Sequence, residues 1–529
     1  MEELELKKIR RLKGFISTSQ RNKWEQNKDQ EWDALTGVLQ DDFQWLKTRF
    51  DRSSDFSYRE FEINSTHKAI ILFLDGLVDM ELVESNILTP LLADNKHVLQ
   101  QSMPLIKEIE KVICSATVNK GEMLQEVVDH VLSGDTVLLV DGVNQSLFIS
   151  EKSWEQRAVE EPATEAVIYG PREGFTENIR TNTSMIRRRL KTSQLKIESM
   201  KVGKLSQTEV VITYLDGIAE HSVVEEVRSR LKRINIDAIE DSGYIVEFIE
   251  DSPYSVFPQV LQTERPDRVV GNLLEGKIGI MADNTPFVLI VPVTFFQLMN
   301  ATGDYYERFI LSSAIRCLRY LFLCIALLFP SIYIAVTTFH QELLPTSLLF
   351  SVASARETVP FPAIVAALLM EISFEALREA GIRLPRPIGS AVSIVGALVI
   401  GQAAVQAGIV GAPLVIVVSI TGIASFMFPS YSLTGAIRLL RFPIMILASV
   451  LGMYGILLGI FFILIHLVRL RSFGVPYLSP ISPFSLSGLK DIFIRAPWWA
   501  MIERPGDTGK RNPNRMRKFL RPRPPNRKN

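Results

Sequence analysis

The sequence predicts a mixed α+β or α/β soluble region made of two tandem related modules, followed by an all-α polytopic membrane domain. Apolar residues make up 47% of the chain, which is high for a soluble protein. They gather between residues 319 and 470, where almost no Lys or Asp occurs, whereas residues 1–318 mix charges of both signs. Two similar strand–turn–helix patterns also occur in the first half. Together these observations predict the two-part architecture.

Composition excludes several classes of function. The 58 Lys and Arg balance 58 Asp and Glu, so no net charge draws the chain to nucleic acid. The three cysteines have no metal-ligand spacing and suit a reducing compartment. The first residues are charged and lead into no apolar run. We therefore expect no signal peptide, and an N-terminal region on the cytoplasmic side.

A repeated pattern predicts the two modules. AIILFLDG ends at Gly76 and VVITYLDG ends at Gly217, and in each an apolar strand stops at Asp-Gly before an amphipathic helix. The two Leu-Asp-Gly triplets lie 141 residues apart, and further matches keep almost the same offset. We therefore expect duplicated α/β modules of strands, turns and helices at residues 65–155 and 205–300.

Charged segments flank these modules. We expect a charged N-terminal extension at residues 1–60, a charged linker with a helix at 156–204 and a basic C-terminal tail at 471–529. The linker helix carries three consecutive arginines, Arg187 to Arg189. Such a triplet usually forms a solvated or subunit-facing surface, and contact with anionic lipid or an acidic partner is the alternative.

The sequence predicts no catalytic, cofactor or metal site. Aspartates beside glycine or asparagine at strand ends are usually turn formers rather than metal ligands, and they are Asp75, Asp141, Asp216 and Asp283. The GDTGK sequence at Gly506 lacks the first half of a phosphate loop. There is no HExxH and no evident pair of nucleophile and base, so we expect no enzyme.

The helical membrane domain is predicted at residues 310–470. Its apolar stretches are residues 320–338, 359–385, 390–408, 414–428 and 444–468. Arginines before the first stretch keep the N-terminal region in the cytoplasm by the positive-inside rule. Five crossings would leave the basic tail outside, whereas its charge favours the cytoplasm. The number of crossings therefore stays open.

Three carboxylates mark the second of these stretches. Glu371, Glu375 and Glu379 lie four residues apart, on one stripe of a helix. An ionised side chain at this depth costs about 2.5–3.5 kcal/mol, so it should face protein or water rather than lipid. Alternatively, Glu375 and Glu379 have left the bilayer and pair with Arg378 and Arg383 at the interface.

Two further pairs stand out in the later stretches. Gln402 and Gln406 lie four residues apart, and we expect them to hydrogen-bond a neighbouring helix, with ion contact as the alternative. Gly455 and Gly459 form a GxxxG pattern, which is typical of a close helix-packing surface.

Three stretches resemble the signature sequences of the A subunits of GerA-type spore germinant receptors. They are EEPATEAVIYGPREGFTENIRTNTSMIRRRL, PFPAIVAALLMEISFEALREAGIRLP and SIVGALVIGQAAVQAG, in the same order as in the family. The resemblance implies a multi-pass protein of the spore inner membrane that converts nutrient detection into germination. It further implies a homo-oligomer, a pentamer, around a central ion path. A transporter-like B subunit that binds the nutrient and a lipoprotein C subunit are the implied partners.

The helix after Pro362 suits the wall of such a path. Several copies around an axis would form an apolar constriction and a ring of carboxylates, which are parts of a ligand-gated cation channel. The candidate pore-lining residues are Phe361, Ile364, Val365, Leu368, Glu371 and Glu375. The alternative is a subunit-packing helix with neutralised glutamates. In a solved assembly, Glu371 turned away from the central axis and locked to an arginine of its own protomer would overturn the proposal of conduction. A solute transporter or a non-conducting scaffold are the rival functions.

Overall fold

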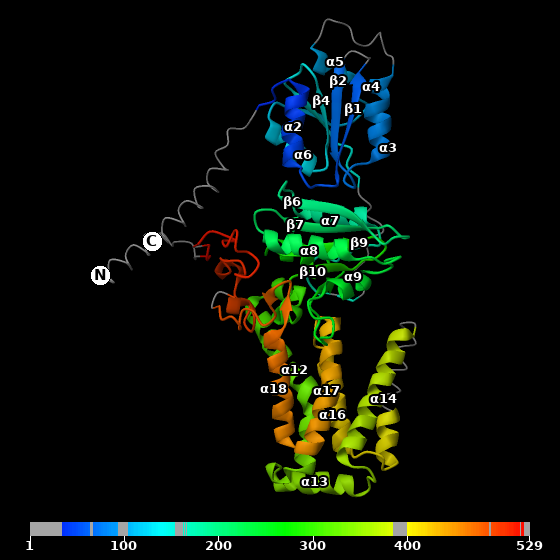
Figure 1. Cartoon of the computed structure of the whole chain (residues 1–529), viewed down its shortest axis with the longest axis vertical. Helices are drawn as coiled ribbons and strands as arrows, with labels where there is room; N and C mark the ends of the chain where they lie inside the picture. The colour runs from blue at the N-terminus through cyan, green and yellow to red at the C-terminus, as the bar shows by residue number, and fades with distance from the viewer. Residues whose placement is uncertain are drawn as a thin grey trace, which may run out of the picture. The chain divides into compact units, whose positions relative to one another are not determined.

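The computed structural model describes residues 34–63, 67–93, 104–153, 162, 164–165, 167–384, 399–485, 488–518 and 520–522 (Figure 1). The chain divides into two compact units. The first spans Met1–Ala158 and Asn178–Ser199, and the second spans Val159–Glu177 and Met200–Asn529.

The first unit is built on a five-stranded antiparallel sheet in the order β1-β2-β4-β5-β3. The strands are β1 (Phe56–Ile63), β2 (His67–Leu74), β3 (Val118–Gly121), β4 (Thr136–Val140) and β5 (Ser146–Ile149). The inner strands are buried almost throughout because helices cover the sheet. The short helices of this unit are α3 (Met80–Val83), α4 (Thr89–Leu92), α5 (Leu105–Val112) and α6 (Leu124–Leu132).

Two helices outside the expected first module belong to this unit. Helix α2 (Leu39–Arg49) buries Leu39, Phe43 and Leu46 in the core, so this part of the expected N-terminal extension is structural. Helix α7 (Ile179–Arg189), expected in the linker, lies in the same unit. Its Arg187 is buried rather than solvated, because all of its hydrogen-bonding nitrogens find acceptors.

The second sheet has the order β6-β7-β9-β10-β8. Its strands are β6 (Leu195–Val202), β7 (Thr208–Leu215), β8 (Leu261–Thr263), β9 (Ile278–Ala282) and β10 (Val288–Val291), and its helices are α8 (His221–Arg233), α9 (Ser242–Ile249), α10 (Pro266–Leu273) and α11 (Phe295–Leu298). This is the strand order of the first sheet, as two copies of one module would give. Gly76 and Gly217 end equivalent strands with positive φ angles of 83° and 81°, which glycine adopts without strain.

The rest of the second unit is a helical bundle. Its members are α12 (Phe309–Thr338), α13 (Thr346–Glu357), α14 (Ala363–Arg383), α16 (Ala412–Ser425), α17 (Tyr431–Leu451) and α18 (Met453–Arg469). Helix α12 packs against α14, α16, α17 and α18. By length and composition, α12 and α17 could cross a membrane, and α16 and α18 are shorter apolar helices.

The expected single span at residues 444–468 is wrong. The chain reverses at Gly452, where φ is +61°, so that α17 and α18 form an antiparallel hairpin (Figure 1). An apolar run continues across the turn, which is why hydropathy alone fused the two helices.

The segment after α18 packs on the second module instead of forming a free tail. Ser472 donates a hydrogen bond to the carbonyl of Gln259 at 2.7 Å, and the Tyr477 hydroxyl donates to the carbonyl of Pro258 at 2.7 Å. The backbone N–H of Phe295 donates to the carbonyl of Tyr477 at 2.9 Å. The bundle therefore begins and ends beside the same α/β module.

Candidate functional site

The core of the helical bundle contains a buried ion pair between Glu371 on α14 and Arg441 on α17. The Arg441 Nη1 donates to Glu371 Oε2, and the side chains are 2% and 0% exposed. Arg441 Nε also donates to the carbonyl of Ala326 on α12 at 3.0 Å. One guanidinium thus joins three helices, because its planar set of donors can serve several acceptors at once.

The second carboxylate of the stripe is also paired within the chain. Arg438 on α17 donates from Nε to Glu375 Oε1 at 3.0 Å, and its Nη2 lies 2.6 Å from Glu375 Oε2. The two side chains are only 23% and 20% exposed. Glu379 pairs with Arg383 one turn further along α14, but both of those side chains are exposed. The stripe therefore runs from a fully buried charge to a solvated one.

Arg378 does not form the ion pair with Glu375 that was expected if these residues lay at the membrane interface. Its Nη1 donates to Ser425 Oγ on α16 at 3.3 Å, and its guanidinium lies 4.7 Å from the centre of the Phe426 ring. Arg383 does pair with Glu379, as that alternative expected. The partners of Glu371 and Glu375 come instead from α17.

The candidate pore-lining residues divide between two faces of α14. Ile364 and Leu368 pack with Glu371 toward the bundle core. Val365 is 42% exposed on an adjacent face of the helix, and Phe361, just before the helix begins, is 40% exposed. The residues therefore do not form one continuous stripe beside a free carboxylate, because Glu371 turns toward Arg441 in its own chain.

The expected glutamine pair is exposed, whereas the expected glycine pair packs against a neighbouring helix. Gln402 and Gln406 are both exposed in this chain. Gly455 and Gly459 face α17: a Cβ on Gly455 would lie 2.1 Å from the carbonyl oxygen of Leu447, and one on Gly459 would lie 3.3 Å from a side-chain carbon of Ile444. No larger residue than glycine fits at Gly455 without moving the helices apart.

A second group of charges lies where α12 leaves the second module. We call Asp304, Tyr305, Arg316, Arg319 and Asp491 the α12 base cluster. Arg316 Nε donates to Asp304 Oδ2 at 3.0 Å, and Arg319 contacts both oxygens of the same carboxylate at 3.0 and 3.1 Å. Arg316 Nη1 also donates to Asp491 Oδ1 at 2.7 Å. This cluster ties the first bundle helix to both the module and the C-terminal segment.

Burial and the neighbouring charges shift the pKa values of Asp491 and Tyr305 in the α12 base cluster. The Tyr305 hydroxyl donates to Asp491 Oδ2 at 2.6 Å, and burial raises the pKa of Asp491 while the nearby Arg316 lowers it. Burial also raises the pKa of Tyr305 well above its ordinary value, so this residue acts as a neutral hydrogen-bond donor. The cluster is an electrostatic joint between the α/β module and the bundle.

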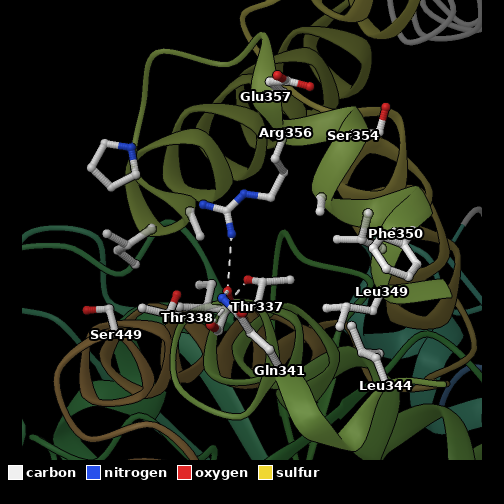
Figure 2. A pocket seen from close by; sticks show the side chains of 16 residues that line it. Thr337, Thr338, Gln341, Leu344, Leu349, Phe350, Ser354, Arg356, Glu357 and Ser449 are labelled. Carbon is white, nitrogen blue, oxygen red and sulfur yellow. Dashed lines mark hydrogen bonds between the residues drawn. The ribbon is translucent and has the colours of Figure 1, made fainter. Parts of the chain in front are cut away.

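A cavity of about 880 Å³ lies at the far end of the bundle, where α13 crosses below the other helices (Figure 1). It is lined by the end of α12, by α13 and by the start of α14. Arg356 reaches across it and donates from Nη1 to the carbonyl of Thr337 at 3.4 Å, whereas Glu357 points away (Figure 2). The cavity is a recess whose lining includes one cationic side chain, that of Arg356.

Sequence reasoning missed the partners of the carboxylates. Arg438 and Arg441 lie three residues apart, on one face of an apolar helix. Their spacing could have indicated that they pair with the two carboxylates four residues apart on α14. The α12 base cluster joins residues up to 187 positions apart, from Asp304 to Asp491, and no local pattern indicates it. Within the described parts of the chain, no group of three or more His, Cys, Asp or Glu could hold a metal ion.

Comparison with known proteins places this chain in a family. The family model described as Bacillus/Clostridium GerA spore germination protein matches residues 44–507. The chain is 49% identical over 488 residues to the uncharacterized membrane protein YfkQ of Bacillus subtilis, covering 92% of this chain and 94% of the relative. It is 46% identical over 485 residues to spore germination protein KA of the same organism, covering 90% and 88%.

A solved structure also matches part of the chain. The N-terminal domain of the A subunit of the Bacillus megaterium spore germinant receptor GerK3 is 36% identical, with a TM-score of 0.41, and the match covers 50% of this chain and 99% of that domain. The family match extends over both α/β sheets and the helical bundle with its ion pairs. The chain therefore belongs to the GerA family of spore germination proteins, as an A subunit of the germinant receptor type.

Proposed function

We propose that this chain is the membrane subunit of a nutrient-sensing germinant receptor in the spore inner membrane, and that copies of it form a ligand-gated cation channel that triggers germination. The long apolar helices α12 and α17 support membrane insertion. Because the bundle begins and ends at the second module, both α/β modules and the C-terminal segment would lie on the cytoplasmic side.

The observation that carries the channel proposal is an exposed apolar stripe on α14. Val365, Leu369 and Ile372 are 42%, 41% and 58% exposed and follow one another at helical spacing, and Phe361, just before the helix begins, is 40% exposed. The same face continues to the exposed Glu379. Around an oligomer axis, such a face would make an apolar constriction that closes by losing water, followed by a ring of charge.

Glu371 and Glu375 enter this proposal as parts of a latch. In the conformation described, Arg441 and Arg438 neutralise them inside the protomer. They would reach the ion path only if α14 moved relative to α17 and the pairs opened. The free energy for that movement has to come from a partner that binds the two states with different affinity.

The partners proposed for this movement follow the family. A transporter-like B subunit would bind the nutrient, a lipoprotein C subunit would complete the receptor, and the homo-oligomer would be a pentamer. The α12 base cluster offers a rigid route by which contacts at the cytoplasmic module could move α12 and the helices packed on it.

One observation favours a second candidate function, a non-conducting scaffold for the receptor complex. The Glu371–Arg441 pair neutralises the buried charge without any ion path, as a packing helix would require. Under this alternative the exposed stripe of α14 would face lipid or another subunit permanently.

Cysteine accessibility separates the two functions. In a chain whose Cys114, Cys317 and Cys324 are changed to serine, Leu369→Cys would be placed on the exposed stripe and Ile446→Cys on the exposed face of α17. The receptor would be reconstituted in liposomes, and nutrient-triggered K⁺ flux measured before and after a charged, water-soluble thiol reagent.

For a channel lined by α14, the reagent should abolish most of the flux through Leu369→Cys and spare Ile446→Cys. Glu371→Gln should also change the flux in the absence of reagent. Absence of flux in the parent receptor, or an equal loss of flux after the reagent at both positions, would favour the scaffold.

A further inference from the structure

A cavity of about 510 Å³ lies between the second module and the C-terminal segment. It is lined by α10, by the turn that carries Tyr305 and by parts of residues 475–515. Its volume falls in the range of small-molecule sites, about 300–1,000 Å³. It is separate from the cavity at the far end of the bundle, and the proposed ion path does not use it.

The cavity contains a buried ammonium group with unused hydrogen-bond donors. The Lys277 side chain is 1% exposed, and its Nζ donates to Asn272 Oδ1. Glu275 forms a long ion pair with it, with Oε2 4.0 Å from Nζ and so beyond hydrogen-bond distance. An ammonium has three donors, so Lys277 keeps capacity for an acceptor in the cavity.

The other lining cations differ in how far they are neutralised. Arg268 pairs with Glu165, and Arg515 Nη2 lies 2.7 Å from Glu275 Oε1. Arg504 donates only to backbone carbonyls, those of Leu274, Asn512 and Asn514, and no carboxylate of the described residues lies within ion-pair distance of it. The single carboxylate of Glu275 therefore acts on three cationic side chains, those of Arg515, Lys277 and Arg504, and compensates Lys277 and Arg504 only in part.

Most of the lining carboxylates are already paired. Arg265 contacts both oxygens of Asp267 at 3.1 and 2.9 Å. Arg316 and Tyr305 hold Asp491, and Arg515 holds Glu275, as described above. Asp507 accepts a hydrogen bond from Ser479. The Ser479 hydroxyl leaves the charge of Asp507 uncompensated, so one unpaired carboxylate stands against the two partly compensated cations Lys277 and Arg504. The remaining balance is slightly positive, which favours an anionic ligand over a cationic one.

The remaining walls are apolar and aromatic. Phe296, Tyr305 and Trp498 line the cavity together with Leu261 and Ile492. The buried Oδ1 of Asn300 accepts no hydrogen bond from any described residue, so a ligand hydroxyl or N–H could satisfy it. The site therefore combines a cationic end, a flat apolar body and one free acceptor.

We propose that this cavity binds a small organic anion, with a carboxylate or phosphate head on Lys277 and Arg504 and an apolar or aromatic body between the rings. Because the C-terminal segment forms one wall, bound anion would fasten that segment to the second module. The lowered pKa of Lys277, about 8 because burial disfavours its charge, fits a group that gains a counter-ion on binding.

The test uses the full chain in lipid nanodiscs and equilibrium binding of three probes: 4-hydroxybenzoate, phenyl phosphate and the uncharged 4-hydroxybenzamide. Lys277→Met removes the ammonium at nearly constant volume, and Lys490→Met, at an exposed lysine nearby, is its matched control. Gly271 lines the cavity and a Cβ there meets open space. Gly271→Phe should therefore fill the site, and Gly271→Ala is its control.

We expect saturable binding of at least one anionic probe, and which one binds identifies the head group. Lys277→Met should weaken binding about ten- to hundredfold, since it removes a charged hydrogen bond. Gly271→Phe should abolish binding, and both controls should retain it. The proposal is overturned if neither anion binds, if the benzamide binds equally well, or if Lys277→Met and Gly271→Phe leave binding unchanged.

Discussion

Removing one partner of the Glu371–Arg441 pair should destabilise the bundle far more than removing both. Arg441→Met would leave Glu371 charged at a site with 0% exposure, which costs about 3–5 kcal/mol for a buried pair. It also removes the donor to the carbonyl of Ala326, worth about 1 kcal/mol. The double variant Glu371→Leu/Arg441→Met buries no charge, so most of the loss should be recovered.

The assay is SDS titration of the purified chain in mixed micelles, followed by far-ultraviolet circular dichroism. The double-mutant cycle should give a coupling energy of about 2 kcal/mol or more between the two positions. Arg383→Met is the control, because its pair with Glu379 is exposed and should contribute under about 1 kcal/mol. The reasoning is refuted if Arg441→Met costs no more than Arg383→Met, or if the double variant is as unstable as the single one.

Three further outcomes are expected. Arg187→Met should lower the free energy of unfolding of the first unit by about 3–5 kcal/mol, because it leaves the buried carboxylate of Asp55 without its cationic partner. A decrease below about 1 kcal/mol in thermal unfolding would contradict this. Gly455→Leu should reduce the yield of monodisperse protein in size-exclusion chromatography, whereas Gly435→Leu, which meets open space, should not. Lys277 has its pKa lowered from 10.5 to about 8, so the folded state binds fewer protons than the unfolded state between these values. Stability should therefore rise as pH rises through this window, by at most about 3 kcal/mol, and Lys277→Met should flatten the slope.

The sequence determined the parts of this protein that depend on local pattern. Strand periodicity and the Asp-Gly stops indicated two similar α/β modules, but β1 and β6, the first strand of each sheet, lie outside the expected bounds. Three of the apolar stretches coincide with α12, α14 and α16. The glycines of α18 lie where this helix meets α17, and GxxxG spacing is itself a local signal for such a contact. The three family motifs carried the assignment to germinant receptor A subunits, which the comparisons confirm.

Only the tertiary structure decided which charges meet. The four-residue spacing of Glu371 and Glu375 fixed their common stripe but could not reveal that Arg441 and Arg438 lie opposite them on α17. The hairpin at Gly452, the burial of Arg187 and the packing of the C-terminal segment depend on contacts between residues distant in sequence. Periodicity reports which face of an element is apolar, whereas partner choice is set by the packing of whole elements, so ion pairs and cavities appear only once the chain is folded.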